Sequence, residues 1–149
     1  MGDRCYIEIT MRRSDLSRFA AHVDAAPAEK WWDCLTEEEN RPGVVTVSVY
    51  EANYGWYDER AAAAKDGIPF YGTHADGGEY GPYAFASWNG EHCETPLNHD
   101  CDLILAVDED LKPIQRAARR QLRNYVSQRK AIRAAFATAE SEQSLEVAA

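Results

Sequence analysis

Three segments with strand patterns follow one another between residues 68 and 95, with no helical pattern between them. Asn89-Gly90 joins the last two, 83–88 and 91–95, and is the dipeptide most typical of a two-residue β-hairpin. A succession of hairpins argues against a purely parallel sheet. Alternating or β-branched residues predict further strands at 5–12, 44–52 and 101–108.

Helical patterns occupy the rest of the chain. Ser14 is placed to cap a first helix reaching Val23, and a long amphipathic helix is predicted from Leu111 to Phe136. Two shorter helices are predicted at 27–39 and 58–65. The mixture predicts an α+β fold with a largely antiparallel or mixed sheet, helices on one face and the long helix across it. We expect a single globular domain over 1–137 and a frayed or disordered tail over 138–149.

Charge is distributed unevenly along the chain, whose net charge is −9. Residues 1–111 hold 22 acidic and 8 basic residues, whereas 112–133 hold 8 basic and no acidic residues. An acidic body repels nucleic acid at long range, so we do not expect the basic helix to bind nucleic acid. The helix could instead pair with the acidic body, within one chain or in a homo-oligomer. The acidic body could also act as a nucleic-acid mimic.

The N-terminal sequence MGDRCYIEIT has no apolar stretch typical of a secretory signal, and no apolar run reaches the ~18 residues of a membrane helix. The four cysteines form no CxxC pair. Because no secretory signal or membrane helix is predicted, we expect reduced thiols and a cytoplasmic location without a membrane. Nothing in the sequence indicates a cofactor.

The glycine-rich stretch 73–88, THADGGEYGPYAFASW, raises the question of a functional loop. A phosphate-binding loop needs a helix directly after it, whereas a strand pattern follows here and two acids would repel a phosphate. A flexible, solvated connection between two strands is the favoured interpretation. The alternative is an acid–base site, whose candidate residues lie within seven positions: His74, Asp76, Glu79 and Tyr80.

Four soft ligands lie within ten residues and could suit zinc: His92, Cys93, His99 and Cys101. Their spacing matches no common zinc motif, and Cys101 falls on the apolar side of the strand expected at 101–108. We therefore expect no metal site.

Ten of the sixteen aromatic residues fall between positions 50 and 88, and some of them must belong to the core. One interpretation is a core of large residues with the loop aromatics folded back over it. Those in predicted loops are the candidates for anchoring a partner: Tyr54, Trp56, Tyr57 and Tyr80. The preferred hypothesis is a non-enzymatic interaction module, an inhibitor or accessory protein that binds a protein through these aromatics and its acidic surface. The alternative is a small enzyme or ligand-binding domain with its site at residues 74–80.

Overall fold

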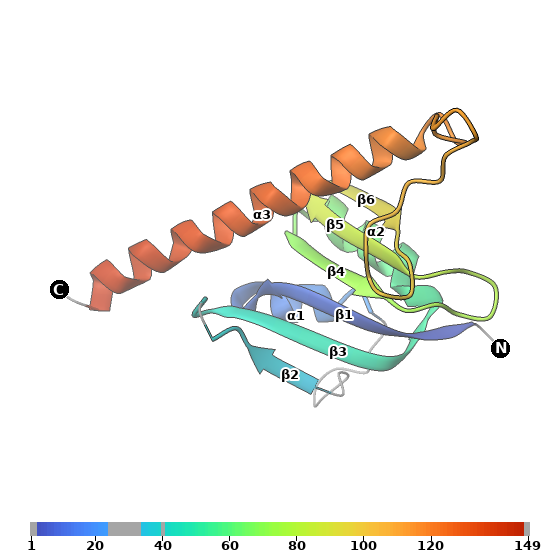
Figure 1. The fold of residues 1–149 in the computed structure, drawn as a ribbon. Coiled ribbons are helices and arrows are strands. Elements are labelled where there is room, and N and C mark those ends of the chain that lie inside the picture. Colours follow the sequence, from blue (N-terminus) through green and yellow to red (C-terminus); the bar gives the residue numbers. More distant parts are fainter. Residues whose placement is uncertain (1–2, 24–33, 40, 148–149) are drawn as a thin grey trace.

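The chain folds around one six-stranded antiparallel sheet with the strand order β2-β3-β1-β4-β5-β6. The structure is a computed structural model that describes residues 3–23, 34–39 and 41–147. It confirms the predicted α+β class with a long C-terminal helix (Figure 1). The elements in chain order are β1 (Arg4–Arg12), η1 (Arg13–Asp15), α1 (Leu16–Ala20), β2 (Cys34–Glu37), β3 (Val44–Asn53), η2 (Tyr54–Trp56), α2 (Tyr57–Lys65), β4 (Phe70–His74), β5 (Tyr83–Trp88), β6 (Glu91–Pro96) and α3 (Ala118–Val147).

The helices divide between the two faces of the sheet, whereas the sequence predicts them on one face. In Figure 1, α1 and α2 lie behind the sheet and α3 crosses in front of β5 and β6. The two hydrophobic clusters follow this division, because neighbouring residues of one strand enter different clusters. Phe70 of β4 packs with the residues of α1, while Tyr71 packs with those of α3. We refer to these as the α1/α2 face and the α3 face.

The α1/α2 face carries the larger core. Alternate residues of β1 and β3 point to this face, as a strand with one buried side requires. Complete burial of one such side chain contributes about 1.5–3 kcal/mol. The fully buried members from the strands and α1 are Ile7, Ile9, Met11, Val45, Ala52, Phe70, Phe85 and Phe19.

Helix α3 lies mainly over β4, β5 and β6, and it also contacts Arg12 of β1 and Val44 of β3. Its buried side chains Tyr125, Ile132 and Phe136 pack against Tyr71 and the small residues of β5. Several β1 and β3 residues on this face are polar, and Thr10 and Ser48 among them are buried. The surface beside the helix is therefore more polar than the part that α3 covers.

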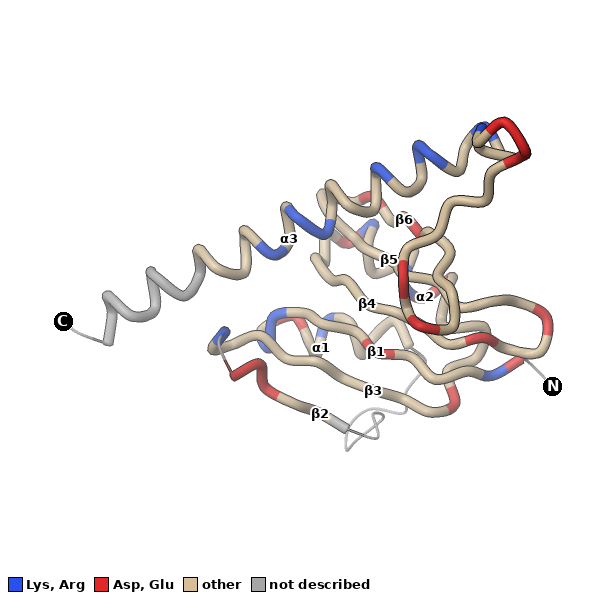
Figure 2. Tube along the Cα trace, viewed as in Figure 1, with Lys and Arg blue, Asp and Glu red and all other residues tan. Residues whose placement is uncertain are grey.

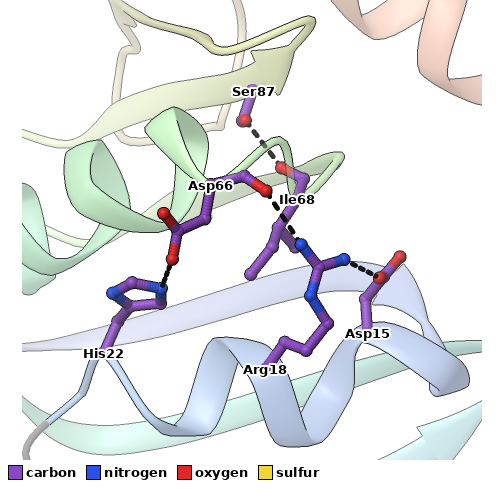
Figure 3. Close-up of polar contacts among 6 residues, drawn as sticks. All are labelled: Asp15, Arg18, His22, Asp66, Ile68 and Ser87. Atoms are coloured by element: carbon purple, nitrogen blue, oxygen red, sulfur yellow. Dashed lines mark hydrogen bonds and ion pairs between the residues drawn. The ribbon is translucent and has the colours of Figure 1, made fainter.

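Polar contacts join helix α1 to the turn between α2 and β4 (Figure 3). The Arg18 guanidinium donates to the Asp15 carboxylate at 2.9 Å and to the Asp66 carbonyl at 2.8 Å. His22 Nε2 lies 2.8 Å from the Asp66 carboxylate. Ser87 Oγ, fully buried, donates to the Ile68 carbonyl at 2.7 Å and ties β5 to the same turn.

The start of α1 differs from the sequence expectation. Ser14 lies within η1, and among the described residues no side chain caps either helix. Helix α1 ends at Ala20, yet the predicted apolar residues Leu16, Phe19 and Val23 are buried. The apolar spacing was therefore the sound part of the prediction and the cap was wrong.

The helix expected at 27–39 is wrong over its last part, because β2 occupies Cys34–Glu37 and pairs with β3. The first part of that prediction, with Trp31 and Trp32, falls outside the described residues. Residues 34–37 gain ladder hydrogen bonds to an otherwise open edge of β3. Tertiary pairing thus overrides the local helical pattern.

The strand expected at 101–108 is a loop with isolated bridges from Leu97 to Leu103 and from Val107 to Pro113. Cys101 is exposed with φ 63°, so its predicted place on a buried strand face is wrong. The long helix begins at Ala118, and the expected first apolar positions, Leu111 and Ile114, are exposed. At its other end α3 continues to Val147, through most of the stretch in which fraying is expected.

Gly72 lies where β4 closely approaches the backbone of β1, and this gives a stability prediction. A Cβ at this position would lie 2.0 Å from the Glu8 carbonyl oxygen and 2.8 Å from Cζ of Phe85. We expect Gly72→Ala to lower the free energy of unfolding by about 2–4 kcal/mol, since backbone and a core ring must move. The matched control is Gly81→Ala, where a Cβ meets nothing within 4 Å. Urea denaturation of both variants compares them, and equal losses would contradict the prediction.

Candidate functional site

Three consecutive residues adopt left-handed backbone angles where β3 passes into α2. Their φ values are 47° at Tyr54, 58° at Gly55 and 55° at Trp56. Such angles cost a residue with a side chain about 1–2 kcal/mol. Strain of this kind persists only where the surrounding structure enforces it, and it concentrates at functional sites. We call Tyr54–Trp56 the left-handed turn.

Arg60 holds the left-handed turn from beneath. Its side chain is fully buried on α2, and Nε donates to the Gly55 carbonyl at 2.8 Å. Nη2 donates to the Glu94 carboxylate of β6 at 2.6 Å. The guanidinium carbon lies 3.9 Å from the centre of the Phe85 ring, within cation–π range. One cation therefore links the turn, β5 and β6.

His92 completes the surroundings of Arg60. Its Nε2 accepts a hydrogen bond from Arg60 Nη1 at 3.1 Å, since a guanidinium only donates. Burial, and then the positive charge of Arg60, lower the pKa of His92 to about 3. Burial also lowers the pKa of Arg60, while Glu94 opposes that shift. Below the left-handed turn there is thus one buried ion pair with a neutral imidazole beside it.

Asp3 fixes the other side of the left-handed turn and the glycine-rich loop. The Asp3 carbonyl accepts from the Tyr54 N–H at 2.7 Å. Its carboxylate accepts from the N–H groups of Gly78 and Glu79, both at 2.8 Å. These two hydrogen bonds lower the pKa of Asp3. Two backbone N–H groups of the glycine loop are therefore hydrogen-bonded to Asp3. The loop links β4 to β5, as the sequence predicts.

The four candidate acid–base residues are only partly brought together. His74 is buried with its ring centre 5.5 Å from that of Tyr80. Its Nδ1 donates to the Ala75 carbonyl at 2.9 Å, and burial lowers its pKa. Asp76 and Glu79 are exposed in the loop. His74 and Tyr80 thus form an aromatic packing contact, with the two carboxylates outside it.

The four predicted aromatic anchors take different positions. Tyr54 and Tyr57 are 50% and 52% exposed, one in the left-handed turn and one at the start of α2. Tyr80 is half-buried with its ring centre 6.4 Å from that of Tyr54, and burial raises the pKa of its hydroxyl. Trp56 packs against the core of the α1/α2 face. Tyr54 and Tyr80 therefore lie together, and Tyr57 is exposed three residues after Tyr54, at the start of α2.

We call the surface at Tyr54, Tyr57 and Tyr80 the tyrosine edge. Exposed carboxylates border it on the adjoining segments: Glu51, Asp58, Asp76 and Glu79. In Figure 2 the acidic residues of β3 and of the loop after β4 lie at the same end of the molecule, while many of the Lys and Arg residues follow α3. A basic residue also lies at this end, because Arg4 of β1 pairs with Glu51 at 2.7 Å. The tyrosine edge therefore combines aromatic and acidic groups.

The four candidate metal ligands do not converge. His92 is taken up by Arg60, and Cys93 is the next residue of β6, so it points to the α3 face with the cluster of Tyr125. His99 and Cys101 are exposed in the loop after β6. Within the described residues, no three His, Cys, Asp or Glu side chains are grouped to hold a metal ion.

Two of the organising residues, Arg60 and Asp3, were not identified from the sequence. Arg60 sits in the helical stretch DERAAAAK, where an arginine normally lies on the solvent side. Its only sequence signal is the alanine run around it, which makes that helix small enough to bury. Asp3 lies at the start of β1 and carries no motif.

No protein-family model matches the chain, and no similar curated protein or solved structure was found. In the part of the chain that the structure describes, no helix is both long and apolar enough to cross a membrane.

Proposed function

We propose that this protein is an interaction module whose tyrosine edge binds a basic segment of a partner protein, as an inhibitor or accessory protein would. The observation that carries the proposal is the left-handed turn. Two residues with side chains hold unfavourable backbone angles there, and a fully buried arginine supports them. The strained backbone at Tyr54 lowers the stability of the fold, and it holds in place a tyrosine that is half-exposed. Such strain is typical of functional sites.

The chemistry of the tyrosine edge indicates the partner. Tyrosine rings provide rigid contact area at low entropic cost and are enriched among residues that dominate binding energy. The bordering carboxylates attract lysine and arginine and repel acidic surfaces. A basic, partly apolar segment therefore fits this edge best.

An enzymatic site at residues 74–80 has less support. The exposed positions of Asp76 and Glu79 keep the carboxylates outside the His74–Tyr80 contact. A base or acid must lie within hydrogen-bond reach of the group it serves.

Photo-crosslinking tests the proposed interaction. We expect p-benzoylphenylalanine at position 57, introduced in producing cells, to crosslink one protein that the same group at Val126 does not. Val126 is a matched exposed position on α3, on the other face of the sheet. Tyr57→Ala and Tyr54→Ala are each expected to lower the affinity for the captured partner at least about tenfold. Val126→Ala should lower it by less than about twofold.

Thermal unfolding separates loss of contact from loss of fold in these variants. Tyr54 and Tyr57 are half-exposed, so we expect both alanine variants to keep the parent melting temperature within about 3 °C. Equal capture at positions 57 and 126, or unchanged affinity in both tyrosine variants, would refute the proposed interaction.

A further inference from the structure

A groove of about 340 Å³ lies on the α3 face, between the sheet, α3 and the loop after β6. The strand register explains why it is hollow. Glu8, Thr73 and Ala84 are direct cross-strand neighbours on this face, and the side chains of Thr73 and Ala84 are small. The adjacent row places Thr10 beside Tyr71, whose ring forms a wall. The groove is therefore built by the order of small and large residues across three strands.

The β1 wall of the groove presents hydrogen-bond acceptors. Thr46 Oγ1 donates its single proton to the Glu38 carboxylate at 3.1 Å. The 2.8 Å contact between the two threonine hydroxyls must then be donated by Thr10, which leaves the lone pairs of Thr10 Oγ1 available. Glu8 lies two residues away on the same face and also lines the groove.

The Glu8 carboxylate is held in place by Tyr6. The Tyr6 hydroxyl donates to Glu8 Oε1 at 2.5 Å. Burial, and then this hydrogen bond, raise the pKa of Tyr6 to about 12, so the hydroxyl keeps its proton. The β1 wall thus combines an oriented carboxylate with a hydroxyl oxygen, a pair suited to an ammonium group.

The α3 wall presents a donor. Arg129 lines the groove with its guanidinium carbon 5.5 Å from the centre of the Tyr71 ring. Its Nε is buried and has no hydrogen-bond partner among the described residues. An unpaired buried donor on a cation is costly, and a carboxylate pairs with guanidinium through two parallel hydrogen bonds. The rest of the lining includes apolar side chains, Leu97 and Tyr125 among them.

We propose that this groove binds a free α-amino acid with an apolar side chain. The ammonium group would contact Glu8 and Thr10, the carboxylate would contact Arg129, and the side chain would lie against Tyr71 and Leu97. A ligand with only one charge would leave one of the two walls unsatisfied. A volume of this size suits a small ligand. The site lies on the opposite face from the Arg60 cluster and does not depend on the function of the tyrosine edge.

Calorimetric titration with matched probes tests the amino-acid groove. We expect L-leucine, L-methionine or L-phenylalanine to bind with a dissociation constant below about 1 mM. For the tightest of the three, the analogue without the amine and the analogue without the carboxylate should each bind at least about tenfold more weakly. For leucine these analogues are 4-methylpentanoic acid and 3-methylbutylamine. Failure of all three amino acids to bind, or equal binding of either analogue, overturns the proposal.

Two variants and two matched controls assign the binding to the groove. Arg129→Gln and Glu8→Gln are each expected to weaken binding of the amino acid at least about tenfold. Arg123→Gln and Glu51→Gln make the same charge changes at exposed positions outside the groove and should alter affinity by less than about twofold. Melting temperatures confirm that the variants are folded. Parent affinity in both groove variants overturns the assignment.

Discussion

Replacing Arg60 with methionine is expected to lower the free energy of unfolding by about 3–5 kcal/mol, as breaking a buried ion pair does. The substitution leaves the Glu94 carboxylate, with a side chain only 19% exposed, without its cation. It also removes the donor to the Gly55 carbonyl, and the left-handed turn loses its support. Urea denaturation measures the loss directly.

An exposed ion pair provides the control for Arg60. Arg4 and Glu51 are joined at 2.7 Å, but their side chains are 61% and 69% exposed. We therefore expect Arg4→Met to cost less than about 1 kcal/mol. The double variant Arg60→Met/Glu94→Leu should recover part of the loss, because no buried charge remains. A loss in Arg60→Met no larger than that in Arg4→Met would contradict the role given to Arg60.

Acid is expected to destabilise the fold well above the range in which carboxylates titrate. An unfolded His92 takes up a proton near its ordinary pKa of 6.5, whereas the folded one stays neutral down to about pH 3. Between these values the unfolded state binds more protons, so the free energy of unfolding falls as pH falls. The limiting slope from His92 is about 1.4 kcal/mol per pH unit. Burial lowers the pKa of His74 and adds in the same direction.

The variant His92→Gln isolates this contribution. The glutamine carbonyl can still accept from Arg60 but does not titrate. Comparing unfolding at about pH 7.5 and about pH 5, we expect the parent to lose more stability than the variant by about 1–2 kcal/mol. The lowered pKa of Asp3 stabilises the fold above its ordinary value of 3.8, and this stabilisation is lost only below that pH, outside this window. Equal losses in parent and variant would show that His92 is not the titrating group.

Local patterns predicted the fold where a strand's partner is close in sequence. The hairpin of β5 and β6 forms around Asn89 and Gly90, both with positive φ, as their dipeptide predicts. The same patterns failed where the outcome depends on what covers a segment. Residues 101–108 alternate like a strand, but two isolated bridges are all they form. Likewise Leu111 and Ile114 continue the helical spacing of α3, yet they lie outside both the helix and the core.

The tyrosine edge was predictable in part because loop aromatics stand out in a sequence. The rings of Tyr54 and Tyr80 lie 6.4 Å apart and Tyr57 is exposed at the start of α2, while the larger Trp56 packs against the core. What organises them was not predictable. An arginine in a helix that reads as polar gives no sign that it will be buried, since burial depends on Glu94 of β6 arriving beside it. The amino-acid groove depends in the same way on register across β1, β4 and β5.

The central position of β1 has a consequence for the order of folding. The strands β4, β5 and β6 can form hairpins from neighbouring residues, but β1 must pair with β3 and β4, tens of residues away. Pairings of such long sequence separation close slowly, because the loop entropy is lost before the contacts form. Because β1 is synthesised before β3 and β4, it must wait for both before the sheet can close around it, and its apolar residues stay exposed to other chains during that interval.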